Sequence, residues 1–453
     1  MSAEVMHGRR VALIDGDSRF DLVVPLQARV DDVLRAAGSA PTRHTRVVGI
    51  SGREILRSTP MTGLDDGAVL VLVDPTASLP GATVRATEAR AARLAAAWWV
   101  LAAGGGILAL LRLQSADALP EQVRAPVGVL ALVAALLAAA VFGLRARART
   151  ATLAPVVGVI ALAFGGGVAV VPDLPASADL VAVFTGVLSA AIVAGVLGVL
   201  GSTDSLCAQS RTAAIVLAML AAVWGAALLL HLDVSAPAAV TLGLVPVAQR
   251  ILQASLVDVA PGTFIDYGRF QSTRWTVRQN LPDEVRTIEA DDADALVQRS
   301  TARLSIGTLL LVAAGAASAF AALPSFPAGE PVVLGGRIAL AVTVVLALLL
   351  GSRRSTVPSL RWVARAGAVI VLAAVLGALL PAFSPELLVG IAGILLLVGL
   401  GAALLVVPVG RGLRSLGWSR TGDVFEALAT ALSLPAGMLA AGAIEIARAM
   451  MAT

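Results

Sequence analysis

Long uninterrupted apolar runs constrain the fold of this chain more than any other feature. Each run approaches or exceeds the roughly 18 residues that a membrane-spanning helix needs. Apolar residues make up 58% of the 453 residues, whereas a soluble globule holds roughly 45–50%. The sequence therefore predicts an α-helical polytopic membrane protein with eleven transmembrane helices, at 94–111, 126–144, 152–171, 180–201, 212–231, 236–252, 304–322, 332–351, 362–382, 387–409 and 422–447.

The distribution of arginine indicates the orientation of these spans. All 34 basic residues are arginine. If the N-terminus is cytoplasmic, 30 of them fall in cytoplasmic segments, and the other side keeps Arg112, Arg124, Arg337 and Arg448. Arginine collects in cytoplasmic segments because it resists transfer across the bilayer during insertion. We therefore predict a cytoplasmic N-terminus, and the odd number of spans places the C-terminus in the periplasm.

The N-terminal segment has the pattern of a small α+β domain. The stretches RRVALIDGD and SRFDLVVPL predict a β-hairpin, and Phe20, Leu22, Val24 and Leu26 alternate onto one face of it. A helix at VDDVLRAAG and strands at TRVVGI, EILRS and AVLVLV follow. This order predicts a ubiquitin-like (β-grasp) domain, with another small α+β fold as the alternative. A β-grasp domain without a catalytic set is expected to bind protein.

The predicted organisation has five parts. They are a ubiquitin-like cytoplasmic domain (1–75), a linker with a juxtamembrane helix (76–93), transmembrane helices 1–6 (94–256), a cytoplasmic loop (257–303) and transmembrane helices 7–11 (304–453). The arginine-containing half of the linker is expected to begin the first membrane helix. The loop is expected to turn helical at Pro282, which suits the first helical position, and to continue into the seventh span as one rod.

The loop at 257–303 carries the candidate partner-binding residues. Its eight carboxylates nearly cancel its six arginines, which argues against nucleic acid. Four of the chain's 17 aromatics lie within 12 residues there, in a mixture typical of a protein interface or of the membrane–water interface. A solvated connector is the plain alternative. The candidate residues are Phe264, Tyr267, Arg269, Phe270, Arg274, Trp275 and Arg278.

Small residues and prolines are frequent in the spans. Pairs four residues apart, such as Ala191/Gly195 and Ala194/Gly198, permit close contact between helices. The glycine triplets 104–106 and 165–167 and the pair Gly390/Gly393 belong to the same pattern. Two prolines, Pro246 and Pro435, lie inside predicted spans, where we expect tolerated kinks rather than breaks.

The residue inventory argues against several kinds of chemistry. Because the chain has no lysine, it cannot bind phosphates through a P-loop lysine and cannot form a Schiff base through a lysine amine. With only one cysteine and three histidines, the chain has few residues that could form a metal site or a proton relay. Ionisable residues fall near predicted span ends, whereas ion-coupled transporters keep a buried charge near the midplane. We predict no catalytic, cofactor or metal site; a secondary transporter with a regulatory cytoplasmic domain is the alternative to a scaffold.

The combined architecture resembles a known family. A ubiquitin-like domain, a basic linker, eleven spans and one long loop after the sixth span are similar to EccD, the multi-spanning membrane component of mycobacterial type VII (ESX) secretion systems. The resemblance covers essentially the whole chain and rests on the order of these parts, since no single short motif defines the family. The lysine-free composition, rich in alanine, glycine and arginine, also suits a high-GC actinobacterium.

The resemblance implies a location and a set of partners. EccD proteins sit in the bacterial inner membrane with EccB, EccC and EccE. They dimerise around a lipid-filled vestibule, and their ubiquitin-like domains contact the EccC ATPase. The resemblance thus implies a non-catalytic scaffold or channel-forming subunit that docks the ATPase through its domain and loop. It further suggests the ESX system linked to iron and siderophore acquisition, with membrane lipids as partners and without cofactor or nucleic acid.

Overall fold

The structure is a computed structural model that divides into two compact units, Met1–Ala91 and Ala92–Thr453. It describes residues 8–15, 18–37, 45–49, 54–73, 81–114, 120–145, 153–173, 178–256, 290–323, 330–355, 357–380, 384–410 and 416–452.

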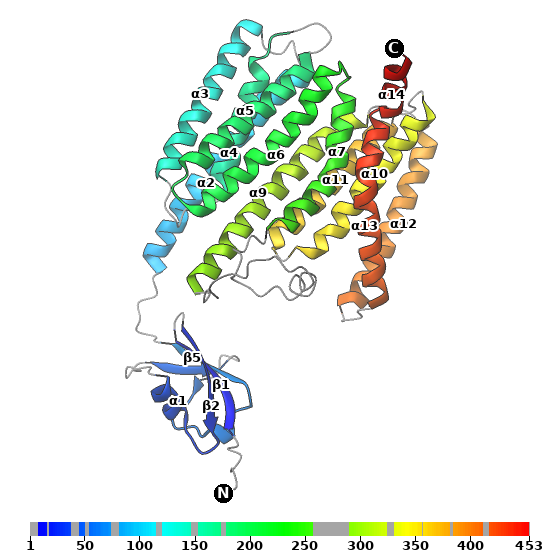
Figure 1. Ribbon diagram of the computed structural model, residues 1–453. Helices are drawn as coiled ribbons and strands as arrows, with labels where there is room; N and C mark the ends of the chain where they lie inside the picture. The colour runs from blue at the N-terminus through cyan, green and yellow to red at the C-terminus, as the bar shows by residue number, and fades with distance from the viewer. Residues whose placement is uncertain are drawn as a thin grey trace, which may run out of the picture. The chain divides into compact units, whose positions relative to one another are not determined.

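The first unit is a five-stranded sheet crossed by one helix (Figure 1). Its elements are β1 (Gly8–Asp15), β2 (Ser18–Pro25), α1 (Val30–Ala36), β3 (Arg46–Gly49), β4 (Glu54–Ile55), the 3₁₀ turn η1 (Met61–Gly63) and β5 (Ala68–Val73). The strand order is β2-β1-β5-β3-β4, with β1 and β5 parallel and the other pairs antiparallel. This is the β-grasp topology, so the predicted ubiquitin-like domain is confirmed.

The core of the β-grasp unit lies between α1 and one face of the sheet. Val30, Val33 and Leu34 of α1 are fully buried, as their helical spacing predicts. From β2, Val24 is buried in the same cluster and Phe20 and Leu22 pack against it, which confirms the predicted alternation. Met61 of η1 is also fully buried there. A single methionine in a polar connection carries no periodic signal, so the sequence did not indicate its role.

The second unit is a bundle of long helices. They are α2 (Gly81–Gln114), α3 (Glu121–Arg145), α4 (Leu153–Val170), α5 (Ala178–Leu200), α6 (Asp204–Leu229), α7 (Ser235–Ala254), α9 (Ala290–Ala322), α10 (Pro331–Gly351), α11 (Pro358–Leu379), α12 (Pro385–Gly410) and α13 (Leu416–Ala440), with the 3₁₀ turn η4 (Ser352–Arg354) after α10 and a short α14 (Ala443–Ala452). Each predicted span overlaps one long helix, and the last span also runs into α14.

Ten of these helices are long and apolar enough, over the described residues, to cross a membrane. The remaining predicted span, 387–409, corresponds to α12. Of this helix only Pro385–Ile394 is described well enough to be judged, and that apolar segment is too short to count among the ten. A 20-residue helix is about 30 Å long, the thickness of the hydrocarbon core of a bilayer. The chain is therefore a polytopic helical membrane protein with an N-terminal β-grasp domain.

The helices lie side by side, with α2–α5 on one side of the bundle and α10–α13 on the other (Figure 1). Helices α6, α7 and α9 join the two groups, because α6 packs on α5 and α9, and α7 packs on α9 and α13. We call the end at which α2, α9 and α13 begin the basal end, and the opposite end, at which α2 and α9 finish, the distal end.

Several helices extend past the apolar runs that predicted them. Helix α2 begins at Gly81, inside the linker, and α9 runs without a break from Ala290 to Ala322. Both expectations of continuous helices are thus confirmed for the described residues, while 282–289 lie outside them. Helix α6 begins at Asp204, eight residues before the predicted span, since Thr203 caps it by accepting a hydrogen bond from the Leu206 amide (3.4 Å).

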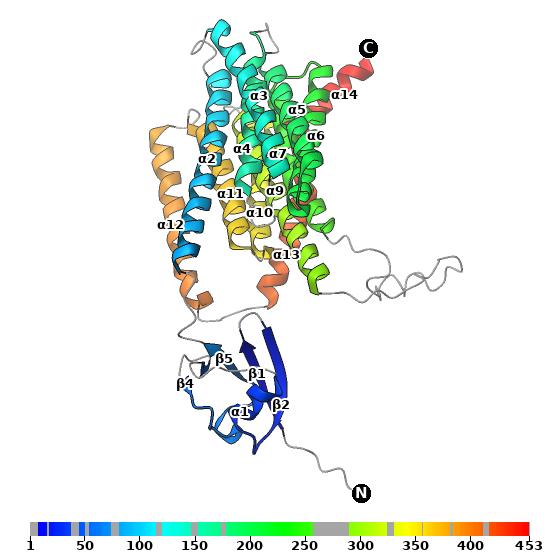
Figure 2. The same ribbon diagram turned by 90° about the vertical axis from the view of Figure 1, so that its left-hand side faces the viewer.

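The prediction that the last span continues to residue 447 is wrong. Helix α13 ends at Ala440, and Gly442 adopts a left-handed conformation (φ +73°) before α14 begins. The Gly442 amide bonds to the carbonyl of Leu439, an arrangement typical of helix ends that finish at glycine. Figure 2 shows α14 leaving the direction of the bundle. The apolar run continues across the turn, which is why hydropathy alone misplaced the end.

Helix α4 is the centre of close packing among the first four long helices. Within the 18-residue apolar segment of each helix, 67% of α4 is buried inside the protein, compared with 17% of α2 and 22% of α3. Consecutive helical residues point about 100° apart, so the three glycines 165–167 face three different neighbours. Gly165 lies against Gly105 of α2, Gly166 against Gly128 of α3, and Gly167 against Gly186 of α5. We call these six residues the glycine hub.

The other small-residue and proline predictions have mixed outcomes. Gly198 packs against Arg211 and Ser210 of α6, but Gly195 has no neighbouring atom within 4 Å among the described residues, and neither has Gly390 or Gly393. Spacing shows which small residues share a face, not whether another helix meets that face. Helices α7 and α13 both continue through their prolines, Pro246 and Pro435, as predicted.

Candidate functional site

The residues singled out from the sequence as partner-binding lie outside the part of the chain that the structure describes. They are Phe264, Tyr267, Arg269, Phe270, Arg274, Trp275 and Arg278. The described residues instead contain two charged clusters, one at each end of the bundle, a polar pocket beside the first cluster, and an apolar face on the β-grasp sheet.

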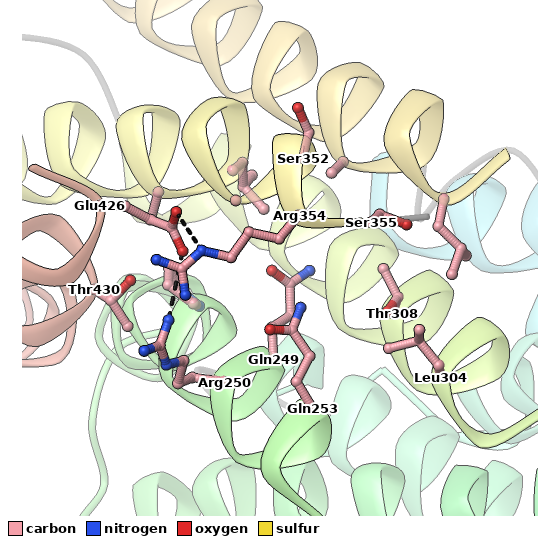
Figure 3. A pocket seen from close by; sticks show the side chains of 16 residues that line it. Gln249, Arg250, Gln253, Leu304, Thr308, Ser352, Arg354, Ser355, Glu426 and Thr430 are labelled. Atoms are coloured by element: carbon pink, nitrogen blue, oxygen red, sulfur yellow. Dashed lines mark ion pairs between the residues drawn. The ribbon is translucent and has the colours of Figure 1, made fainter. Parts of the chain in front are cut away.

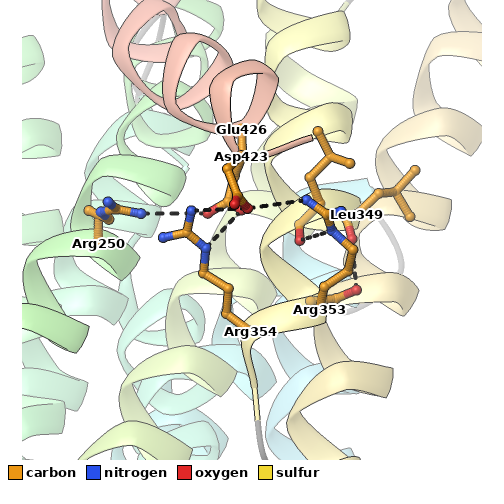
Figure 4. A network of polar contacts seen from close by, with 8 residues as sticks. Arg250, Leu349, Arg353, Arg354, Asp423 and Glu426 are labelled. Carbon is orange, nitrogen blue, oxygen red and sulfur yellow. Dashed lines mark hydrogen bonds and ion pairs between the residues drawn. The ribbon is translucent and has the colours of Figure 1, made fainter. Parts of the chain in front are cut away.

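The basal cluster joins the end of α7, the turn η4 and the start of α13 (Figure 4). Glu426 of α13 lies between two arginines, with its Oε1 3.6 Å from Nη1 of Arg250 and its Oε2 3.0 Å from Nε of Arg354. One turn earlier on α13, Asp423 lies 3.7 Å from Arg353 and 3.6 Å from Arg354. Three elements that are distant in the sequence are thus held together by charge.

Glu426 differs from its partners in exposure. Its side chain is 7% exposed, while those of Arg250 and Arg354 are 53% and 38% exposed. A buried carboxylate is tolerated only when opposite charges and hydrogen bonds compensate for its lost hydration. The two guanidinium groups supply the opposite charges, and both are more exposed than the carboxylate. The pairing fixes the beginning of α13 against α7 and η4.

A pocket of about 260 Å³ opens beside this cluster (Figure 3). Its polar wall contains Arg250, Arg354 and Glu426, and its apolar wall comes from α7, α9, α10 and α11. The side-chain nitrogen of Gln249 is buried and has no hydrogen-bond acceptor among the described residues. The polar side chains that complete the lining are Gln249, Gln253, Thr308, Ser352, Ser355 and Thr430.

The distal cluster contains two of the four arginines that the predicted topology leaves on the periplasmic side. Arg112 ends α2 and Arg124 begins α3, and their side chains are only 2% and 3% exposed. Both approach the same oxygen of Asp173, at 3.1 and 3.0 Å, and Arg112 also lies 3.5 Å from Asp179. Arg124 donates a further hydrogen bond to the carbonyl of Val171 (3.3 Å). Two carboxylates thus neutralise two buried arginines.

The interior polar contacts are structural. Trp224 of α6 donates a hydrogen bond to Thr241 of α7 (3.2 Å), and Ser433 of α13 donates one to the carbonyl of Gly243 (2.8 Å). Among the residues searched, no three His, Cys, Asp or Glu side chains are grouped so as to hold a metal ion. These two hydrogen bonds link α6 to α7 and α7 to α13.

The β-grasp sheet has an apolar face opposite α1. Strand residues alternate between faces, so the residues next to the buried Leu13 and Leu70 point to the open side. Val23 and Val73 on this side are 71% and 45% exposed. A contiguous exposed apolar patch commonly marks a site of protein interaction. Its apolar residues are Val23 and Val73, the partly exposed Ile14, Val48, Val69 and Val71, and the buried Ala12. The charged residues Arg10, Arg19, Asp21 and Arg46 lie on the same face.

Sequence reasoning placed some of the charged residues of both clusters near span ends, but predicted neither cluster. Arg112, Arg124, Arg250, Asp423 and Glu426 all stand near the ends of predicted spans, which is the only signal that the sequence gives. Which helix ends meet in the bundle depends on packing between helices that are far apart in the chain. The pairing of Arg250 with Glu426 therefore required the structure.

The fold is similar to that of a solved secretion-complex protomer over nearly its whole length. Protomer 1 of the ESX-3 core complex matches with a TM-score of 0.51 and 19% identity, over 97% of this chain and 100% of that chain. An ESX-5 inner membrane complex without MycP5, in State II, gives a TM-score of 0.47, 16% identity, and 88% and 99% coverage. No family model and no curated protein matches the sequence. The shared fold agrees with the resemblance to EccD.

Proposed function

We propose that this chain is an EccD-type subunit of a type VII (ESX) secretion complex in a bacterial inner membrane. The observation that supports the proposal most strongly is the extent of the structural match: 97% of this chain and all of the ESX-3 protomer chain are covered, so the likeness includes both units. We propose further that the subunit is a non-catalytic scaffold, since both charged clusters and the interior hydrogen bonds of Trp224 and Ser433 join helices of the bundle.

The distal cluster supports the proposed orientation, with the N-terminus in the cytoplasm and the C-terminus in the periplasm. The arginine count leaves Arg112 and Arg124 as exceptions on the periplasmic side. Both are buried and paired with Asp173, so their charge is neutralised within the fold. The pairing shows how the fold accommodates two arginines on the side that the arginine bias disfavours.

We propose that the apolar face of the β-grasp sheet docks the secretion ATPase, EccC in the family's terms. The face is apolar at its centre, and charged residues lie at its edges, including the exposed pairs Arg19–Asp21 (3.1 Å) and Arg46–Glu54 (3.2 Å). An apolar centre with a polar rim is typical of protein interfaces. EccB, EccE and a second copy of this chain are the proposed partners of the membrane unit.

The double substitution Val23→Asp with Val73→Asp is expected to abolish co-purification of the ATPase. Val23 and Val73 lie on the open side of the sheet, across from Arg10 and Arg46. Carboxylates at these two positions replace apolar contact surface with charge that must lose its hydration on docking. Both side chains are exposed, so the domain itself should remain folded. The measurement is the amount of ATPase recovered with the tagged full-length chain from native membranes.

The matched control for this experiment is Ala36→Asp. Ala36 is also exposed, but it lies on α1, which covers the opposite face of the sheet. We expect it to leave ATPase recovery unchanged. If the Val23/Val73 variant recovers as much ATPase as the control, the sheet face is not the docking surface.

The loop at 257–303 remains a proposed second contact. The double substitution Tyr267→Ala with Trp275→Ala is expected to leave membrane insertion intact and to weaken assembly of the complex. Normal assembly would favour the membrane–water interface as the site of these aromatics.

The proposed link to the iron- and siderophore-associated ESX system is tested separately, by growth of a deletion strain under iron limitation. Growth equal to that of the parent strain would refute it.

A further inference from the structure

The pocket at the basal end contains more hydrogen-bond donors than the protein itself uses. Arg250 approaches Glu426 through Nη1, at 3.6 Å, and its side chain is 53% exposed, so its other guanidinium nitrogens are open to a ligand. The buried side-chain nitrogen of Gln249 likewise has no acceptor there. A buried donor without an acceptor is costly. The pocket therefore favours a ligand that is rich in acceptor oxygens.

The charge of the lining has the same implication. Two arginines and one carboxylate line the pocket, which gives 2 − 1 = +1, and the adjacent pair Arg353–Asp423 adds no net charge. Glu426 faces both arginines and is neutralised by them, so a second anion meets a positive surface. A phosphate group carries both the negative charge and the several acceptor oxygens that guanidinium and amide donors bind.

The apolar wall indicates that the phosphate belongs to a lipid. Pro246, Leu304, Leu348, Leu360 and Ala364 line the pocket on the side of the membrane helices. The pocket lies where α7 and α10 end, beside Glu426 and Thr430 of α13, and we infer that it is at the depth of lipid headgroups. Basic pockets between membrane helices bind anionic headgroups. Its volume of about 260 Å³ is below the roughly 300–1,000 Å³ of sites that enclose drug-sized ligands, so only part of a lipid is enclosed.

We propose that this pocket binds the phosphate of an anionic phospholipid, with Arg250 and Gln249 as direct donors and Arg354 held in place by Glu426. One lipid molecule bound there contacts α7, α9, α10 and α11, and also Glu426 and Thr430 of α13. Because such a ligand binds the folded bundle and not the unfolded chain, it stabilises the membrane unit by mass action.

The test is binding of phosphatidylglycerol to the purified full-length chain, followed by thermal unfolding and by native mass spectrometry. Phosphatidylglycerol should raise the unfolding temperature, while phosphatidylcholine should have little effect. Gln249→Leu and Arg250→Gln should each weaken phosphatidylglycerol binding by about tenfold, the loss expected for a hydrogen bond to a charged group. Gln249→Leu keeps both ion pairs of Glu426, so its effect does not depend on the stability of the cluster.

The matched control is Arg365→Gln. Arg365 lies in the first part of α11 but outside the pocket. Its guanidinium carbon lies 5.3 Å from the centre of the Trp362 ring. It should bind phosphatidylglycerol as the unchanged protein does. Inorganic phosphate that stabilises the chain as well as the lipid does would overturn the lipid assignment. Equal binding by Gln249→Leu, Arg250→Gln and the unchanged protein would overturn the pocket itself.

Discussion

Replacing Gly165 by leucine is expected to prevent α4 from packing into the bundle. A Cβ atom at this position would overlap the backbone of Gly105 on α2, and backbone cannot rotate away as a side chain can. Overpacking in a core costs about 1–3 kcal/mol even where side chains adjust. Here α2 must move as a whole, so we expect a loss at or above the top of that range, about 3 kcal/mol, and little folded protein.

The matched control is Gly195→Leu on α5. This glycine also lies within a spanning helix, but no atom of the described structure lies within 4 Å of an added Cβ. The comparison isolates the close approach of helices from the effect of changing glycine to leucine in a membrane segment. The measurement is the yield and unfolding temperature of each detergent-purified variant. Equal values for the two variants would show that the glycine hub does not hold α4 in place.

The second large effect is expected for Asp173→Ala at the distal end. This carboxylate is the shared partner of Arg112 and Arg124, and both of those side chains are at least 97% buried. Removing one member of a buried ion pair costs roughly 3–5 kcal/mol. Here it leaves buried Arg124 without a carboxylate partner, while Arg112 keeps its ion pair with Asp179. Asp173 itself is 49% exposed, so we expect the lower end, about 3 kcal/mol, measured as a loss of unfolding free energy.

Two comparisons make this prediction specific. Asp233→Ala removes an exposed carboxylate at the same end of the bundle, one without an ion pair in the described structure, and should change stability little. The triple variant Arg112→Leu, Arg124→Leu, Asp173→Ala removes the buried charge together with its partner and should recover most of the loss. If Asp173→Ala is as stable as Asp233→Ala, the cluster does not contribute to folding.

The fold was largely predictable because its two units depend on local patterns. Apolar runs of spanning length predicted the long helices, and strand alternation at Phe20, Leu22 and Val24 predicted the β-grasp hairpin. The predicted helix ends were wrong where hydropathy gives no information on the backbone conformation. The turn at Gly442 divides an apolar run that hydropathy treats as continuous, and the cap at Thr203 starts α6 within polar sequence.

The candidate site was predictable only as a set of residue types near helix ends. Glu426 and Arg250 are in contact because α7 and α13 pack together, and nothing in either segment encodes the other. The same holds for the glycine hub: the triplet at 165–167 indicated close packing, but not that each glycine meets a different helix. The aromatic and arginine residues at 264–278 lie outside the described residues, and their role stays a prediction.

The most direct measurement of the central claim is purification of the tagged full-length chain from its native membrane, with identification of everything that accompanies it. The account predicts a secretion ATPase, further membrane subunits of the same complex and a second copy of this chain. A chain that purifies alone and catalyses solute uptake in proteoliposomes would contradict the account and would identify a transporter instead.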